Sequence, residues 1–257
     1  MRKHFLLGAW AIFSLLSASE GTAAKDGAMP PVPGPAVEEI PIPDVDVSAS
    51  AGPRELSYEA IARGLEAFAL HQQQAPAAKP QFRVRPVQQE ASLKGLHLVL
   101  STPGRNRDLP FDKNGAFTPP QLDAADRAQA RIALNPTDGA FAIAPFVRTP
   151  GLAPDTLRMG DLRVGCEMRW AIAREDNDTF PLILYGPGGP CHSHLVKSVL
   201  QAPRPVSSIW LVYGQRREAL PVERLKADRI TFMPPIHDDS WPDDTLIELK
   251  FLEDARR

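Results

Sequence analysis

Apolar and polar residues alternate strictly along residues 161–172. The apolar positions are Leu162, Val164, Cys166, Met168, Trp170 and Ile172, each separated from the next by a charged or small residue. Successive side chains of a strand point to opposite faces of its sheet, so this period of two is typical of a strand with one buried face. We therefore expect a β-strand over this segment.

Weaker alternation of the same kind predicts six further strands, over residues 93–101, 130–135, 181–185, 206–213, 229–233 and 245–252. Turn residues such as Asp138-Gly139 separate these segments. Many short strands with frequent turns predict a mostly β fold, an antiparallel β-sandwich built as one large unit or two small ones. We expect two, with a first sandwich region over residues 80–150 and a second over residues 151–257.

One segment has the period of a helix instead. Residues 57–74 contain no proline and place Tyr58, Ile61, Leu65 and Phe68 three or four positions apart, which forms one apolar stripe. Ser57 is suited to cap the first turn. We expect an amphipathic helix within residues 56–78, which either packs its stripe on its own domain or presents it to a partner.

The first 24 residues have the three-part layout of a secretory signal peptide. Arg2 and Lys3 precede an uncharged apolar run over residues 5–16, and small and polar residues follow up to Ala24. A permanent span needs about 20 apolar residues, so this shorter run favours cleavage over an uncleaved anchor. We expect cleavage after Ala24, with Ser19 as the alternative, no transmembrane segment after cleavage, and a periplasmic or secreted mature chain.

Residues 25–55 are rich in proline and alanine and poor in large side chains. Such a composition buries too little apolar surface to offset its ordering entropy, and it predicts a semi-extended linker. The alternative is that Ile40, Ile42 and Val45 pack on the edge of the folded domain.

The charge balance bears on the kind of partner. The chain has 29 basic and 31 acidic residues and a net charge of −2. Loss of the leader would remove Arg2, Lys3 and Glu20 and leave a net charge of −3. A surface of this sign attracts neither nucleic acid nor an anionic membrane, so we expect no nucleic-acid partner.

A short stretch of the first sandwich region resembles a known family. The apolar residues 96–100 are followed by Asp112-Lys113-Asn114-Gly115-Ala116-Phe117, an Asp-x-x-Gly-x-Phe sequence. Together they resemble the strand and hairpin of transthyretin-like modules, also called carboxypeptidase regulatory-like domains. The resemblance covers about 25 residues. It implies a small prealbumin-type sandwich that binds or supports other parts and has no catalytic residues of its own.

The two cysteines, Cys166 and Cys191, have two interpretations. In an oxidising compartment, an even pair in a β-rich protein predicts a disulfide, which typically contributes about 2 to 4 kcal/mol. The alternative is a copper or zinc site in which Cys191, His192 and His194 are ligands, because the two histidines would point to one face of a strand. Cys166 or His237 would complete that coordination sphere.

The remaining candidates for chemistry are weaker. Asp238, Asp239, Asp243 and Asp244 surround Trp241 and could act as acid or base only if burial raised a carboxyl pKa. The sequence contains no serine-hydrolase elbow and no dinucleotide fingerprint. We therefore expect no catalytic site, and we interpret the chain as a binding, assembly or accessory module of the cell envelope. Its expected partner is another envelope protein or a surface polymer, which could pair with an exposed sheet edge.

Overall fold

The computed structural model describes residues 55–87, 92–135, 141–174 and 189–252, all within one compact unit that spans Pro43–Arg257. The predicted signal peptide, nearly all of the predicted linker and the predicted strand over residues 181–185 lie outside the described residues. No helix in the described ranges is long and apolar enough to cross a membrane.

Within these residues the strands form four sheets, and every strand pair is antiparallel. The first sheet has the order β1-β6-β3-β4, made of Glu55–Ser57, Arg131–Asn135, His97–Thr102 and Arg105–Leu109. The second has the order β5-β2-β7, made of Ala116–Phe117, Gln81–Pro86 and Phe141–Phe146. The third has the order β11-β10-β13-β8, made of Arg216–Ala219, Val206–Tyr213, Leu246–Phe251 and Thr156–Arg158. The fourth pairs β12, Thr231–Phe232, with β9, Leu200–Gln201.

The predicted mostly β, antiparallel fold class is thus confirmed. The strands β3, β6, β10, β12 and β13 each overlap a segment for which alternation predicts a strand.

In the part of the chain that the structure describes, three α-helices accompany the sheets: α1 (Tyr58–His71), α2 (Ala124–Arg127) and α3 (Met159–Ala173). Single 3₁₀ turns follow at η1 (Gln72–Gln74), η3 (Pro190–His192) and η4 (Val222–Arg224). The helix α1 lies within the segment where the apolar stripe predicts a helix. The Ser57 side chain accepts a hydrogen bond from the Ala60 backbone N–H, as an N-cap does. Tyr58, Ile61 and Phe68 of the stripe are buried in the chain's own core, so α1 packs its apolar face inward.

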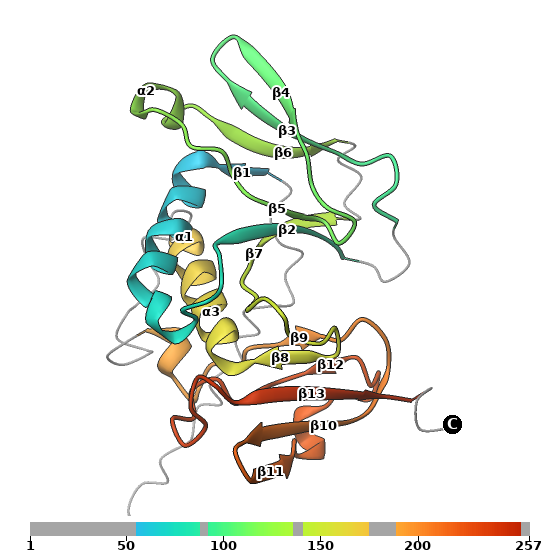
Figure 1. Cartoon of the computed structure of the whole chain (residues 1–257). Helices are drawn as coiled ribbons and strands as arrows, with labels where there is room; N and C mark the ends of the chain where they lie inside the picture. The colour runs from blue at the N-terminus through green and yellow to red at the C-terminus, as the bar shows by residue number, and fades with distance from the viewer. Residues whose placement is uncertain (1–54, 88–91, 136–140, 175–188, 253–257) are drawn as a thin grey trace, which may run out of the picture. The chain divides into compact units, whose positions relative to one another are not determined.

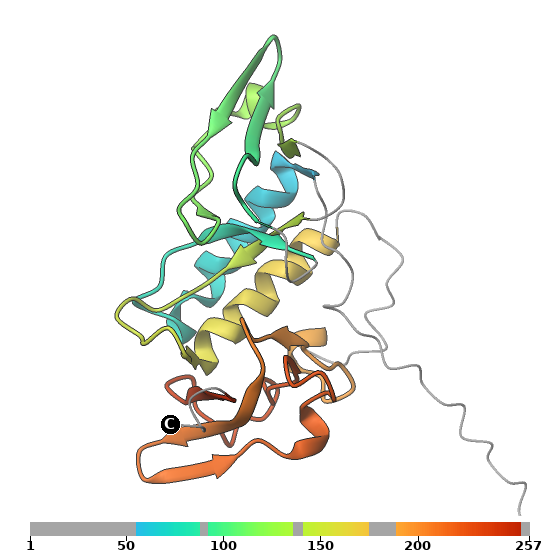
Figure 2. The same cartoon turned by 90° about the vertical axis from the view of Figure 1, so that its right-hand side faces the viewer.

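The strand predicted over residues 161–172 is wrong, because this segment is the helix α3. Its apolar residues form two rows with a spacing of four. Val164, Met168 and Ile172 face the first core, whereas Leu162, Cys166 and Trp170 lie on the other side. Positions two apart in a helix differ by about 200°, so two opposite apolar rows produce the alternation of a strand. Figures 1 and 2 show α1 and α3 side by side.

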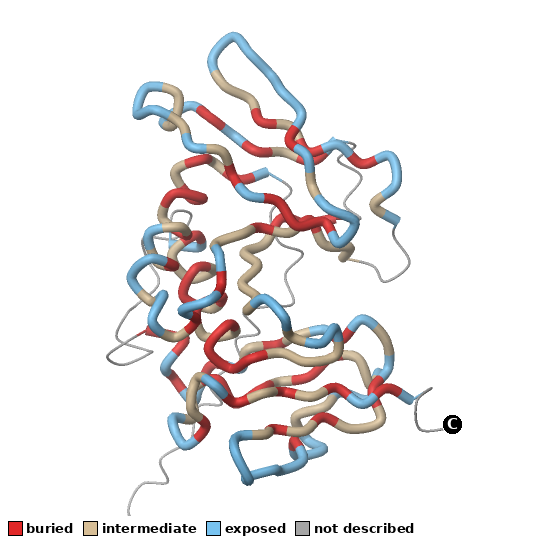
Figure 3. Tube along the Cα trace, viewed as in Figure 1, coloured by how far each residue is buried: buried red, intermediate tan, exposed pale blue. Residues whose placement is uncertain are grey.

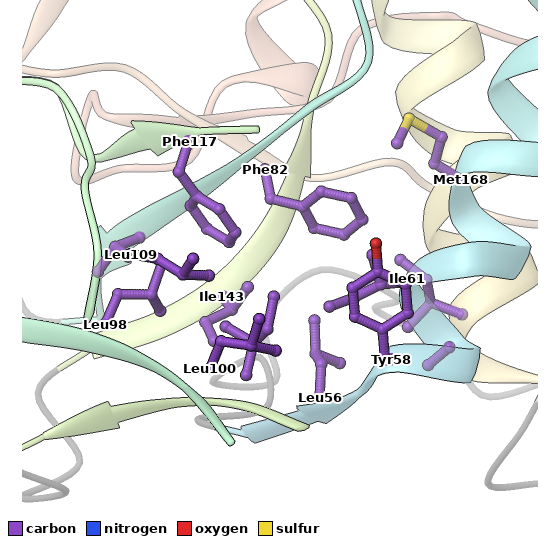
Figure 4. Packing of buried hydrophobic residues seen from close by; sticks show 14 of the residues in the cluster. Leu56, Tyr58, Ile61, Phe82, Leu98, Leu100, Leu109, Phe117, Ile143 and Met168 are labelled. Atoms are coloured by element: carbon purple, nitrogen blue, oxygen red, sulfur yellow. The ribbon is translucent and has the colours of Figure 1, made fainter. Parts of the chain in front are cut away.

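Two clusters of buried residues form the interior. The first core joins α1 and α3 to strands of the first and second sheets, and Figure 4 shows Tyr58, Ile61, Met168, Phe82 and Phe117 within it. The second core joins β10, β12 and β13 to Met159 and Trp241, with Leu162 and Cys166 of α3 packed against it. The predicted boundary between residues 150 and 151 separates β7 from α3, yet the first core contains residues of both.

The Asp-x-x-Gly-x-Phe sequence forms a turn. The Asp112 carboxylate accepts hydrogen bonds from the backbone N–H groups of Asn114 and Ala116, at 2.8 Å each. Gly115 has a φ of 79°, and an added Cβ would lie 2.2 Å from the Val84 carbonyl oxygen, so only glycine fits there. The strands on either side, β4 and β5, belong to different sheets.

Candidate functional site

A disulfide joins α3 to the η3 turn. The sulfur atoms of Cys166 and Cys191 are 2.06 Å apart and their Cα atoms 5.9 Å apart, which is the pairing that the cysteine count favours. Cys191 is buried. Because the bridge uses both sulfur atoms, neither cysteine is available as a thiolate ligand.

The two histidines after Cys191 point to different partners. His192 ends a 3₁₀ turn and His194 follows outside any strand, so the expectation that they share the face of a strand is wrong. The Nε2 atom of His192 lies 3.1 Å from Oε1 of the buried Glu167. The Nε2 atom of His71, in the last turn of α1, lies 3.9 Å from the other carboxylate oxygen.

His194 contributes to the electrostatic environment of His237 instead. The two histidines thus interact with different groups, Glu167 and His237. No group of three or more His, Cys, Asp or Glu side chains in the described part of the chain is arranged to hold a metal ion.

A hollow that is partly open to solvent lies along the outer side of α3. We call it the α3 hollow. The disulfide forms part of its wall, and the other lining side chains are mostly apolar: Leu162, Arg169, Trp170, Pro190, Val196, Ser198, Leu200, Pro234 and Ile236. Gly189 shapes one edge, because its φ is 77° and a Cβ there would lie 3.3 Å from Trp170 Nε1. A concave, mostly apolar wall with few polar groups is typical of a ligand site.

Among the described residues that line the α3 hollow, Arg169 is the one with a charged side chain. Its Nε atom is buried and has no hydrogen-bond partner within the described ranges. The side chain lies back over the preceding turn of α3, with Nη2 3.9 Å from where a Cβ of Gly165 would be. Burial and, secondarily, the nearby cation of Arg85 lower the pKa of Arg169 to about 10, so the guanidinium is still protonated at neutral pH.

Arg85 approaches Arg169 from β2. Phe82 and Val84 of this strand enter the first core, so Arg83 and Arg85 point to its opposite face. Burial lowers the pKa of Arg85, and no acidic group of the described chain offsets that shift. Burial lowers the pKa of Arg83 as well, but Arg83 differs in two ways: its guanidinium lies 3.5 Å from the Phe146 ring centre, and Asp112 partly offsets the shift.

Two other arginines, at the start of α3, are fully engaged. Arg163 donates hydrogen bonds to the backbone carbonyls of Ile236, Asp238 and Trp241 and to Oδ1 of Asp243 at 2.6 Å.

Arg158 donates to Oδ1 of Asp244 at 2.6 Å and to the Gln74 carbonyl at 2.5 Å. These bonds hold the loop over residues 236–244 against the helix.

The four acidic residues of that loop do not form an acid–base site. Asp243 and Asp244 are ion-paired with Arg163 and Arg158. A hydrogen bond from Ser240 lowers the pKa of Asp238, whereas an acid catalyst at neutral pH needs a raised pKa. Asp239 is exposed. Asp243 and Asp244 instead help to hold the loop over residues 236–244 against α3.

The sequence predicts the disulfide, but it does not single out Arg169, which lines the same hollow, or Arg85. In Gln81-Phe82-Arg83-Val84-Arg85, three polar residues alternate with two apolar ones, which is the pattern of a strand with arginines on one face. This alternation could have been used to predict the strand β2.

No protein-family model matches this chain, and no curated protein and no solved structure proves similar to it.

Proposed function

We propose that this chain is an exported binding module of the cell envelope, which acts in the periplasm or outside the cell. One observation carries the proposal: the described chain holds its two cysteines in a disulfide between α3 and η3, with Cys191 buried. Such bonds persist in oxidising compartments and are rare in the cytosol. The signal-peptide pattern at residues 1–24 supports the same compartment.

Binding is favoured over catalysis by the chemistry of the α3 hollow. Among the described residues that line it, the polar side chains include Arg169 and Ser198, and none supplies a carboxylate, an imidazole or a free thiol. A guanidinium that stays protonated cannot serve as a base, and a disulfide is not a thiolate nucleophile. An apolar wall with a fixed cation can hold a ligand without transforming it.

The sheet edges are less favourable places for a partner. The edge strands β4 and β11 expose nearly all their residues and carry charged side chains, among them Arg105, Arg107, Arg216 and Arg217 (Figure 3). Charged edges discourage pairing with another strand. We therefore take the α3 hollow as the candidate binding site, in preference to strand addition at β4 or β11.

A native mass spectrum of the chain, purified without reductant from fractionated cells, tests this proposal. We expect a periplasmic or secreted species that begins after Ala24 and is two hydrogens lighter than the dithiol form. The matched control is the Cys166→Ser, Cys191→Ser double variant, which has no thiols to oxidise. A cytosolic, full-length chain that keeps both thiols would contradict export.

The same spectrum reports bound copper or zinc. Metal together with two free thiols would favour the alternative of a metal-binding protein centred on Cys191, His192 and His194. In that case the His192→Ala, His194→Ala double variant would lose the metal.

A further inference from the structure

The arginine pair Arg85 and Arg169 has positive charge that the described chain does not balance. Neither guanidinium has an ion pair or a side-chain hydrogen bond with any described residue, and the buried Nε of Arg169 is unpaired. A desolvated cation without a partner is costly, which is why buried charges are normally paired. The two cations also repel each other, as the lowered pKa of Arg169 reflects.

The nearest acidic side chains of α3 are engaged elsewhere. Asp161 accepts hydrogen bonds from the backbone N–H and the hydroxyl of Thr149, at 2.7 Å each. Glu167 lies 3.1 Å from His192. Both carboxylates are buried with these partners. The described chain therefore supplies no anion to Arg85 and Arg169, and an anion from outside would fill that role.

Arg169 is placed where an external anion can reach it. Its side chain forms part of the wall of the α3 hollow, whose other walls are the Cys166–Cys191 disulfide, Leu162, Val196, Ile236 and Trp170. A ligand in this hollow would meet apolar and aromatic surface on most sides and a guanidinium on one. That combination fits a molecule with an apolar body and one acidic group.

We propose that the α3 hollow binds a small organic anion, whose acid group pairs with Arg169 and is further attracted by the nearby cation of Arg85, while its apolar body packs against Leu162, Trp170 and the disulfide. A planar guanidinium matches a carboxylate through two parallel hydrogen bonds, which favours a carboxylic acid as the ligand class. This inference deepens the proposed binding function and rests on it only in taking the α3 hollow as the ligand site.

Isothermal titration calorimetry of the oxidised mature chain at pH 7 tests the proposal with three probes. Naphthalene-1-acetate carries both the apolar body and the carboxylate, naphthalene-1-acetamide keeps the body without the charge, and inorganic phosphate is an anion without the body. We expect the acid to bind at least tenfold more tightly than the amide, because charged hydrogen bonds are stronger than neutral ones. Phosphate should bind more weakly than the acid.

Variants assign the effect to residues. Arg169→Gln should lower the affinity for the acid about tenfold or more and leave the affinity for the amide unchanged. Arg85→Gln should cause a smaller loss of the same kind, and it tests the site independently if the first variant folds poorly. The matched control is Arg217→Gln on β11, which removes an arginine paired with Glu248 and should bind the acid as the unaltered chain does.

Two results would overturn the inference. Equal affinity for acid and amide, unaffected by Arg169→Gln, would mean an apolar hollow without anion recognition. Binding of neither naphthalene compound would mean that the hollow is not a site for such ligands. Both results are independent of the mass spectrum. If the chain is oxidised and exported but fails this titration, the proposed anion site is refuted and the proposed location stands.

Discussion

Two pairs of arginines lie around α3, and they differ in what surrounds them. Arg158 and Arg163, at its start, donate to carboxylates and backbone carbonyls of neighbouring segments. Arg169, in its second half, and Arg85, on β2, have no such partners among the described residues. A satisfied guanidinium holds a fold together, whereas an unsatisfied one costs stability and is available to a ligand.

The largest effect is expected at the engaged pair. Arg163→Met keeps the apolar stem and removes bonds to three carbonyls and Asp243, so the free energy of unfolding should fall by about 4 kcal/mol. Urea denaturation measures the loss. Arg217→Met is the control, since it breaks a more exposed ion pair and should cost less than about 1 kcal/mol. A similarly small loss for Arg163→Met would show that the bonds of Arg163 do not hold the loop over residues 236–244 in place.

The disulfide residue Cys166 lies between Arg163 and Arg169 along α3, and loss of the bridge should have the next largest effect. The Cys166→Ser, Cys191→Ser variant frees a loop closed over a separation of 25 residues and should lower the free energy of unfolding by about 3 kcal/mol. The comparison is with the unaltered chain in the same urea titration without reductant. If the double variant were as stable as the oxidised chain, the bridge would contribute nothing to the fold.

Replacement of the unpaired Arg169, unlike that of Arg163, should not lower the free energy of unfolding. Arg169→Gln removes a desolvated charge, so the free energy of unfolding should stay the same or rise by up to about 1 kcal/mol. Thermal unfolding without ligand measures it, with Arg217→Gln as the control. A loss as large as that of Arg163→Met would show that Arg169 has a structural partner and would remove the distinction between the pairs.

The smallest effect concerns pH. Burial, Arg224 and, more weakly, His194 and Arg163 lower the pKa of His237, although Asp238 acts to raise it. The unfolded chain, with a histidine pKa near 6.5, then binds more protons than the native chain as pH falls. Stability should therefore decrease below about pH 6.5.

Denaturation at pH 7.5 and 5.5 measures this dependence, and His237→Gln should reduce it. His97→Gln is the control because His97 is exposed. An unchanged dependence in His237→Gln would assign the effect to other groups.

The two long helices show which parts of the fold the sequence predicts. The helix α1 has one apolar stripe because only one of its sides packs, and its period is that of a helix. The helix α3 packs on two opposite sides, and its two rows, such as Val164 with Met168 and Leu162 with Cys166, together imitate a strand. Periodicity reports how many sides are buried, and it identifies a helix only when that number is one.

The candidate site likewise has one part that the sequence predicts and one part that it does not. Two cysteines in a chain that is predicted to be exported have one another as the obvious partner, so their pairing is predictable from the count. The partners of an arginine cannot be predicted from a count in this way. Nothing near Arg163 or Arg169 in the sequence distinguishes the one that meets Asp243 and three carbonyls from the one that meets none, because their surroundings come from segments up to 80 residues away.

Because α3 contributes one row of side chains to each core, we expect the two cores to unfold together. Loss of the second core would expose Leu162 and Cys166 and loosen the helix that also carries Val164 and Met168 in the first. Amide protons of β3 and β13, which belong to different sheets, should then exchange with solvent at the same slow, global rate. Such a result would mean that a single helix joins two sets of sheets into one cooperative folding unit.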